Sequence, residues 1–321
     1  MKKSQITLLL MLVCLCFSGC GKTSDSEPLS EISEPISSET SEIYEPENEV
    51  SYMEKCKDIM TEIPPEEILS EREGAEYPSF EKHTYYSHTA ERDTPVNVLL
   101  PANYSEDKRY PVLYILHGYY DNEDWMTRSI VHINTMLTNL VADGEAREMI
   151  VVCPYIYCSK DMQYCTGMDT QNTLNYDNFI NDMMTDLMPF IEEKFPVAAG
   201  RENTAITGFS MGGRESLFTG VSHPDKFGYI GAVCAAPGLT EGTGSPWMLK
   251  EEQLTFGESK PRLLLLSAAE HDGVVGTNPA KYRDIFTKNG DEALWHSMSS
   301  TGHDHSSVTP HLYNLFRMIF M

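Results

Sequence analysis

Ser210 stands at the centre of a Gly-x-Ser-x-Gly pattern, which reads Gly-Phe-Ser-Met-Gly at residues 208–212. A β-rich run precedes this pattern, and a helix-like stretch follows it. A strand, a sharp turn and a helix in this order form a nucleophile elbow, which raises a serine hydroxyl above the edge of a sheet. The turn is too tight for side chains at Gly208 and Gly212. The pattern therefore predicts that Ser210 attacks a carbonyl carbon in an acyl-transfer reaction.

A serine hydroxyl becomes a good nucleophile only when a base takes its proton and an acid orients that base. With this elbow, the acid and then the histidine follow the serine along the chain. A leucine-rich run leads into a loop with Asp272, and a later β-rich run leads, behind a glycine, to His303. We expect Asp272 as the acid and His303 as the base. Glu270 remains an alternative for the acid, and His305 remains one for the base.

Two backbone N–H groups are expected to bind the negative oxygen that forms when the carbonyl is attacked. Met211, which directly follows the nucleophile, supplies one of them. The second comes from the chain just beyond a buried strand at 112–116, where His117 and Gly118 lead to Tyr119. Two such donors stabilise the transition state by on the order of several kcal/mol. The side chain of His117 is expected to be structural.

The elements that must position these loops alternate between β-rich and helical stretches from residue 77 to residue 321. Two entry strands are expected at 84–90 and 96–100, and a helix that packs on the sheet is expected at 176–195. Short apolar runs are typical of buried parallel strands, and they occur at 112–116, 150–153, 204–208, 229–234, 262–267 and 293–298. The pattern predicts an α/β fold with a mostly parallel central sheet and helices on both faces.

The first residues have the pattern of a signal peptide, expected at 1–19, because two lysines precede a short apolar run and then small residues. That run is too short to favour a membrane-spanning helix. The residues before Cys20 resemble a bacterial lipobox, although Phe17 stands where leucine is more usual. We therefore expect a lipid on Cys20 and a protein exported to the cell surface, anchored to a bacterial membrane. An ordinary secretory signal is the alternative.

The stretch from residue 20 to residue 50 is rich in serine, glutamate and proline and predicts a disordered linker. Residues 51–76 are expected to be a transitional segment before the α/β domain at 77–321 that contains the expected catalytic residues. The formal net charge of the chain is −24. So large a negative charge argues against nucleic acid as a partner, and it leaves the lipid as the expected contact with a membrane.

Five cysteines remain beyond Cys20, and none of them stands in a zinc-binding spacing. A disulfide between Cys158 and Cys165 and a set of free buried thiols are both compatible with this pattern. No metal ion and no organic cofactor are expected.

Several stretches resemble the esterase D family and, within it, the feruloyl esterases of carbohydrate esterase family 1. The specific parts are Gly-Phe-Ser-Met-Gly-Gly at 208–213, Asp-Lys-Phe at 225–227, Ala-Ala-Pro at 235–237 and Gly-His-Asp at 302–304. The resemblance implies an α/β-hydrolase fold, with Ser210 as nucleophile, His303 as base and Asp272 as acid. One departure is the loop before the acid, which commonly reads Gly-Thr-x-Asp in the family and here reads Ala-Glu-His-Asp. Glu270 therefore stays open.

The resemblance implies hydrolysis of feruloyl or acetyl esters on a plant cell-wall polysaccharide such as xylan, through an acyl-enzyme. The aromatic side chains of Tyr120, Trp125 and Trp247 are expected in loops near the nucleophile. They could stack on a phenolic ring or a sugar, or they could pack at the edges of the core. An acyltransferase, a siderophore-type esterase and a glycan-binding surface lipoprotein without turnover remain as alternatives.

Overall fold

The computed structural model describes residues 50–244 and 246–321, and Glu49–Met321 form one compact unit. The expected signal peptide, Cys20 and almost all of the expected linker lie outside the described residues. Within the described part of the chain, no helix has the length and apolar character needed to cross a membrane.

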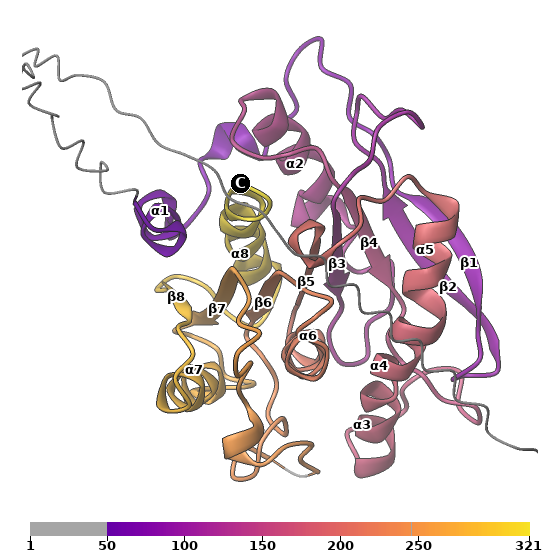
Figure 1. Ribbon diagram of the computed structural model, residues 1–321, viewed down its shortest axis with the longest axis vertical. Helices are drawn as coiled ribbons and strands as arrows, with labels where there is room; N and C mark the ends of the chain where they lie inside the picture. The colour runs from indigo at the N-terminus through magenta and orange to yellow at the C-terminus, as the bar shows by residue number, and fades with distance from the viewer. Residues whose placement is uncertain (1–49, 245) are drawn as a thin grey trace, which may run out of the picture. The chain divides into compact units, whose positions relative to one another are not determined.

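The centre of the unit is a sheet of eight strands in the order β1-β2-β4-β3-β5-β6-β7-β8 (Figure 1). The strands are β1 (Glu81–Ser87), β2 (Arg92–Leu99), β3 (Val112–Leu116), β4 (Ile150–Pro154), β5 (Thr204–Gly208), β6 (Tyr229–Val233), β7 (Leu263–Ala269) and β8 (Leu294–Met298). The pairs β1–β2 and β2–β4 are antiparallel, and all other neighbouring strands in this sheet run parallel. The predicted mostly parallel sheet is confirmed.

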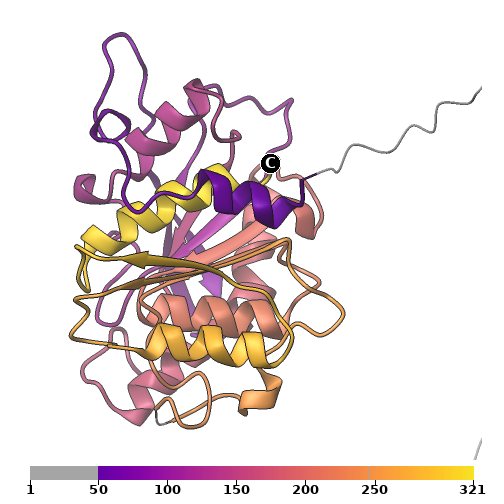
Figure 2. The ribbon, with the colours of Figure 1, turned by 90° about the vertical axis from the view of Figure 1, so that its left-hand side faces the viewer.

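Helices cover both faces of this sheet (Figures 1 and 2). They are α1 (Tyr52–Ile59), α2 (Ile133–Ala142), α3 (Thr170–Asp177), α4 (Phe179–Asp182), α5 (Met188–Lys194), α6 (Met211–Ser222), α7 (Asn278–Lys288) and α8 (His305–Met318). Apolar residues of α1, α2 and α8 join one core with one side of the sheet, and those of α3 to α7 join a second core on the other side. The buried strands therefore lie between two apolar layers.

The helix expected at 176–195 is interrupted. It starts earlier, as α3, and a π-helical turn at Met183–Leu187 separates α4 from α5. Pro189 lies in the first turn of α5. Because proline has no N–H and its ring clashes with the carbonyl four residues earlier, a regular α-helix cannot continue through it. A π turn just before the proline accommodates this constraint.

The segment 51–76 is part of the compact unit and not merely a lead-in to it. Helix α1 begins with a capping box, in which Ser51 and Glu54 bond to each other's backbone N–H groups. Further along, the side-chain amide of Asn314 donates to the carbonyl of Thr61 (2.7 Å) and accepts from its N–H (2.9 Å). These contacts join residues far apart in the sequence, so the folded unit begins near residue 50.

A buried imidazole connects two strands of the sheet that are not neighbours. His311 on α8 lies 2.7 Å from Ser267 Oγ on β7 through Nδ1 and 2.7 Å from Thr207 Oγ1 on β5 through Nε2. Gly231 on β6 lies between them, where a Cβ atom would stand 3.0 Å from His311 Nε2 and 2.6 Å from Thr207 Oγ1. Glycine at this position lets the imidazole reach across β6.

The elements that His311 connects are those that carry the three expected catalytic residues. Strand β5 leads to Ser210, β7 leads to the loop of Asp272, and α8 begins just after His303. The buried hydrogen bonds of His311 therefore fix β5, β7 and α8 relative to one another, and with them the loops that carry the three expected catalytic residues.

This arrangement predicts how stability depends on pH. Burial lowers the pKa of His311 to about 3, from an ordinary value of about 6.5. Only the unfolded chain takes up this proton below about pH 6.5, so the stability that the neutral imidazole contributes is present above that pH and is lost as the pH falls toward 3. Between about pH 4 and 6, the unfolding free energy of His311→Gln should therefore depend on pH less steeply than that of the wild type, by up to about 1.4 kcal/mol per pH unit.

Denaturant unfolding at several pH values measures these slopes. His271 is exposed, so His271→Gln is a matched control that should keep the wild-type slope. Equal slopes for His311→Gln and the wild type would contradict the account.

Candidate active site

Ser210 lies in the turn between β5 and α6, with φ 55° and ψ −113°. A positive φ is uncommon for a residue with a side chain and stores strain. A Cβ at Gly208 would stand 2.4 Å from the carbonyl of Gly212, and one at Gly212 would stand 2.3 Å from the carbonyl oxygen of Leu116. Gly208 is therefore required for the tightness of the turn itself, and Gly212 is required for the close contact of the turn with the end of β3. The strand, turn and helix that the pattern predicts are all present.

His303 lies between Ser210 and Asp272. Its Nε2 is 2.9 Å from Ser210 Oγ, and its Nδ1 is 2.7 Å from Asp272 Oδ2. The ring of Phe209 packs on the imidazole, with the two ring centroids 4.6 Å apart. An imidazole that donates its Nδ1 hydrogen to the carboxylate can accept the proton of the serine at Nε2. The structure thus brings the three expected residues into one hydrogen-bonded chain.

The carboxylate of Asp272 is fixed by more than the histidine. Its Oδ1 accepts hydrogen bonds from the backbone N–H groups of Val274 (2.8 Å) and Val275 (2.9 Å). Burial raises the pKa of Asp272, but the hydrogen bonds from His303 and from these two N–H groups outweigh it, so the pKa lies below its ordinary value. The carboxylate therefore stays charged at neutral pH, and it can stabilise a protonated His303.

The two alternative residues stand outside this chain of hydrogen bonds. Glu270 is exposed, and its carboxylate accepts a hydrogen bond from Ser297 Oγ (3.4 Å). His305 is the first residue of α8. Among the described residues, the carboxylate bonded to the imidazole is that of Asp272, and the imidazole that contacts the serine is that of His303.

A cavity of about 360 Å³ opens beside Ser210. Both expected oxyanion residues, Tyr119 and Met211, line it. In the described part of the chain, neither of their backbone N–H groups has a hydrogen-bond acceptor, so both can donate to a bound carbonyl oxygen. Much of the remaining lining is apolar, and this part consists of Met168, Ala236, Pro237, Pro246, Val274 and Val275. The cavity is suited to the acyl part of an ester.

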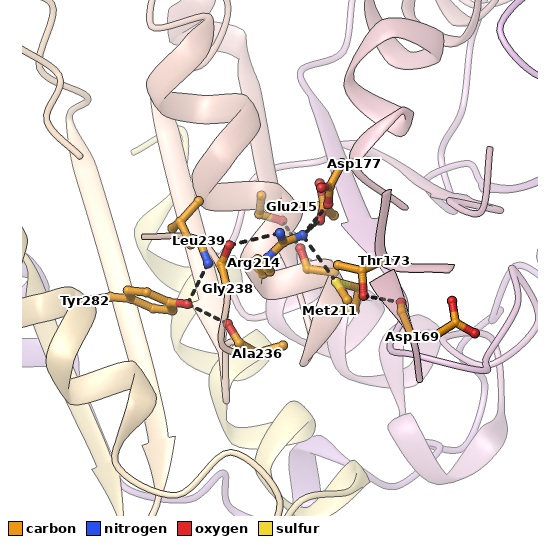
Figure 3. Close-up of polar contacts among 12 residues, drawn as sticks. Asp169, Thr173, Asp177, Met211, Arg214, Glu215, Ala236, Gly238, Leu239 and Tyr282 are labelled. Carbon is orange, nitrogen blue, oxygen red and sulfur yellow. Dashed lines mark hydrogen bonds and ion pairs between the residues drawn. The ribbon is translucent and has the colours of Figure 1, made fainter. Parts of the chain in front are cut away.

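Arg214, one turn into α6, connects this helix with α3 and with the loop after β6 (Figure 3). Its guanidinium group is fully buried, forms ion pairs with Glu215 (2.6 Å) and Asp177, and donates to the carbonyl of Gly238 (3.0 Å). It also lies 3.7 Å from the sulfur of Met211. No motif in the sequence indicates a role for this residue. Its only sequence signal is an arginine and a glutamate side by side near the start of the helix after the nucleophile.

The loop after β6 forms another wall, and α7 fixes it. The hydroxyl of Tyr282 donates to the carbonyl of Ala236 (2.7 Å) and accepts from the N–H of Leu239 (3.1 Å) (Figure 3). This loop is therefore held from α6 by a buried cation and from α7 by a buried phenol.

The three aromatic residues expected at the substrate do not line this cavity. Trp125 is half-buried and stacks on Phe209, with ring centroids 5.3 Å apart and planes 9° apart. This contact supports the turn at the nucleophile. Tyr120 lines a second cavity. Trp247 is 44% exposed and follows Pro246 in the wall of the first cavity.

Cys234, Asp272 and His303 form the one group of potential metal ligands found among the described residues, with ligand atoms within 4.8 Å of one another. Burial raises the pKa of the Cys234 thiol to about 12. A thiol binds a metal as the thiolate, and the other two side chains already bond to each other. This donor set therefore fits a catalytic hydrogen-bond chain better than a metal site. Cys158 and Cys165 are free thiols, so the disulfide alternative is not realised.

Residues 87–283 match a family model described as a putative esterase. A solved structure of a ferulic acid esterase of carbohydrate esterase family 1 from Anaeromyces mucronatus is 36% identical in sequence to this chain. Its TM-score is 0.77, and the match covers 81% of this chain and 97% of that one.

Two curated relatives are longer proteins. An endo-1,4-β-xylanase/feruloyl esterase from Xylanibacter ruminicola is 27% identical over 209 residues, which are 62% of this chain and 28% of the relative. Endo-1,4-β-xylanase Y from Acetivibrio thermocellus is 28% identical over 145 residues, which are 42% of this chain and 12% of the relative. The match therefore spans less than a third of either relative.

Because Ser210, His303 and Asp272 are joined by hydrogen bonds, we expect the losses of activity from substituting them not to add. Ser210→Ala, His303→Ala and Asp272→Asn should each lower kcat by roughly 10⁴ or more with little change in folding, because each removes a part of the same proton transfer. For the same reason, the double variant Ser210→Ala/His303→Ala should be about as slow as the slower of its two single variants. Steady-state hydrolysis of an activated ester measures these rates.

Glu270→Gln is the matched control for the acid, because it removes a neighbouring carboxylate that is not hydrogen-bonded to His303. It should cost far less activity than Asp272→Asn. A larger loss in Glu270→Gln would overturn the assignment of the acid, and high activity in Ser210→Ala would overturn the assignment of the nucleophile.

Proposed function

Because this chain belongs to the esterase family whose model it matches and is a carboxylic ester hydrolase, we propose that it hydrolyses feruloyl or acetyl esters on a plant cell-wall polysaccharide such as xylan. The observation that carries the proposal is the series of hydrogen bonds from Ser210 through His303 to Asp272, beside a cavity that six apolar side chains line in part. The names of the relatives, a ferulic acid esterase and a xylanase/feruloyl esterase, support the substrate class.

The first half of the proposed reaction forms an acyl-enzyme. Ser210 Oγ attacks the ester carbonyl carbon while its proton passes to His303 Nε2, and the backbone N–H groups of Tyr119 and Met211 bind the oxyanion. When the intermediate collapses, the bond from the carbonyl carbon to the sugar oxygen breaks. His303 gives its proton to that oxygen, and the sugar leaves as an alcohol.

The second half restores the enzyme. A water molecule attacks the acyl carbon, and His303 takes a proton from it. When the second intermediate collapses, the bond to Ser210 Oγ breaks and the serine regains a proton from His303. The acid is released, and the charged carboxylate of Asp272 stabilises the imidazolium in both halves.

The lining of the cavity favours an aromatic acyl group over acetyl. An acetyl group would leave most of a cavity of about 360 Å³ unfilled. A ferulate ring can bury its faces against the apolar side chains of Met168, Pro237 and Pro246. The hydroxyl of Thr170 in the same lining can donate to and accept from the polar groups on the ring. The hydroxyl of Thr173 already donates to the carbonyl of Asp169 (3.0 Å) and can still accept.

The substrate preference can be measured directly. We expect the purified enzyme to release ferulate from methyl ferulate with a higher kcat/KM than it shows for acetate release from acetylated xylan. Acetate release alone would instead favour an acetylxylan esterase. Acyl transfer to an added alcohol in preference to water would favour an acyltransferase, and an intact nitrophenyl acetate would favour a binding protein without turnover.

We also propose that the enzyme is exported and held at the cell surface by a lipid on Cys20. The signal-like start and the small residues before Cys20 support this, and a polymeric substrate too large to enter a cell requires an enzyme outside it. Mass spectrometry of the mature protein should find a diacylglyceryl-modified Cys20 at its N-terminus. Cleavage elsewhere or an unmodified Cys20 would contradict the anchor.

A further inference from the structure

A second cavity, of about 290 Å³, adjoins the site, and nothing in the proposed reaction uses it. We infer that this cavity binds the sugar residue whose hydroxyl carries the ester, so that substrate is held on both sides of the bond that breaks. The inference rests on the proposed function and extends it to the alcohol part of the substrate. The side chains that carry the argument are those of Tyr120, Asp121, Asn122, Gln163 and Tyr164.

Two stretches of chain run from one cavity to the other. In the first stretch, Tyr119 lines the cavity beside Ser210, called the acyl cavity below, and the next residue, Tyr120, lines the second one. In the other stretch, Cys165 lines the second cavity and Met168 lines the acyl cavity. The hydroxyl of Tyr119 donates to the carbonyl of Gly167 (3.1 Å), which joins the two stretches. The second cavity therefore begins one residue from an expected oxyanion donor.

Asp121 places the second cavity on the side from which the alcohol leaves. A Cβ at Gly118 would stand 3.0 Å from Asp121 Oδ2 and 3.3 Å from the ring of Phe209, and that ring packs on His303. The leaving alcohol takes its proton from this histidine. When the acyl group lies in the acyl cavity, the sugar on the other side of the ester bond therefore points toward Asp121.

The chemistry of the lining fits a neutral, hydroxyl-rich ligand. Tyr120 is 54% exposed and Tyr164 is 64% exposed, so both offer ring faces on which a sugar can stack. Asn122 and Gln163 can both donate to and accept from sugar hydroxyls.

The charged groups of the lining argue against an anionic ligand. Arg92 already donates to the backbone carbonyls of Tyr157 (3.0 Å) and Met162 (2.8 Å), and Glu123 is paired with Lys82 (2.9 Å). The lining holds three carboxylates, those of Asp93, Asp121 and Glu123, and one guanidinium, that of Arg92. Its net negative charge repels an anion, so a neutral saccharide is favoured.

The test compares a substrate that carries the sugar with one that lacks it. In Tyr164→Ala, the loss of one stacking face should raise the KM for a feruloylated arabinoxylan oligosaccharide about two- to tenfold. Its kcat/KM for methyl ferulate should stay at the wild-type value, because methanol replaces the sugar. Tyr86 is a matched control, since it is 52% exposed on β1 and lines neither cavity. Tyr86→Ala should leave both values unchanged.

A second measurement removes turnover from the test. Titration of Ser210→Ala with an arabinoxylan oligosaccharide without ester should show binding, and Ser210→Ala/Tyr164→Ala should bind it more weakly by the same factor. Equal binding by these two variants, or equal loss on both substrates in Tyr164→Ala, would overturn the sugar site. If wild-type enzyme still hydrolyses methyl ferulate in that case, the proposed function stands. If the wild type hydrolyses no ferulate ester, the proposed function is wrong. The titration of the two Ser210→Ala variants then decides by itself whether the second cavity binds a sugar.

Discussion

The close contact between the turn at Ser210 and the end of β3 is the constraint on which the site depends. The positive φ of Ser210 places its hydroxyl at the sheet edge and its backbone in a conformation that side-chain-bearing residues avoid. Gly212 lets the backbone of the turn approach the end of β3 with no room for a Cβ, and Gly208 lets the turn close on Gly212. Because the strain is local, the surrounding structure must hold it in place. The stacked rings of Trp125 and Phe209 do so from one side.

Buried polar groups then fix the other loops of the site relative to this turn. His311 bridges β5 and β7 through two hydroxyls, and Arg214 connects α6 with α3 and with the loop after β6. Each group is fully buried, so its hydrogen bonds form in a low dielectric and breaking one leaves an uncompensated polar partner. Such contacts stabilise one arrangement of the loops. This is why a site assembled from three separate strand ends can hold distances suited to proton transfer.

The sequence alone could predict the features that depend on neighbouring residues, which are the strands and the loops that follow them. The buried strands appear as short apolar runs, so β3 and β5 have the bounds that their residues indicate. Ser210, Asp272 and His303 each follow a strand, and the order of strands brings them together. Local pattern could not indicate contacts between distant residues: the packing of segment 51–76, the stacking of Trp125 on Phe209 and the pairing of Arg214 with α3. Those contacts depend on tertiary neighbours, which composition and periodicity do not contain.

The central claim is that Ser210 forms a covalent ester with the acyl group during turnover. Mixing the enzyme with excess methyl ferulate, quenching it in acid within the first turnovers and mapping its peptides by mass spectrometry tests this claim most directly. We expect the peptide containing Ser210 to gain the mass of one feruloyl group and Ser210→Ala to show no such gain. Ferulate released at the normal rate with the acyl group on another residue, or with Ser210→Ala as active as the wild type, would contradict it.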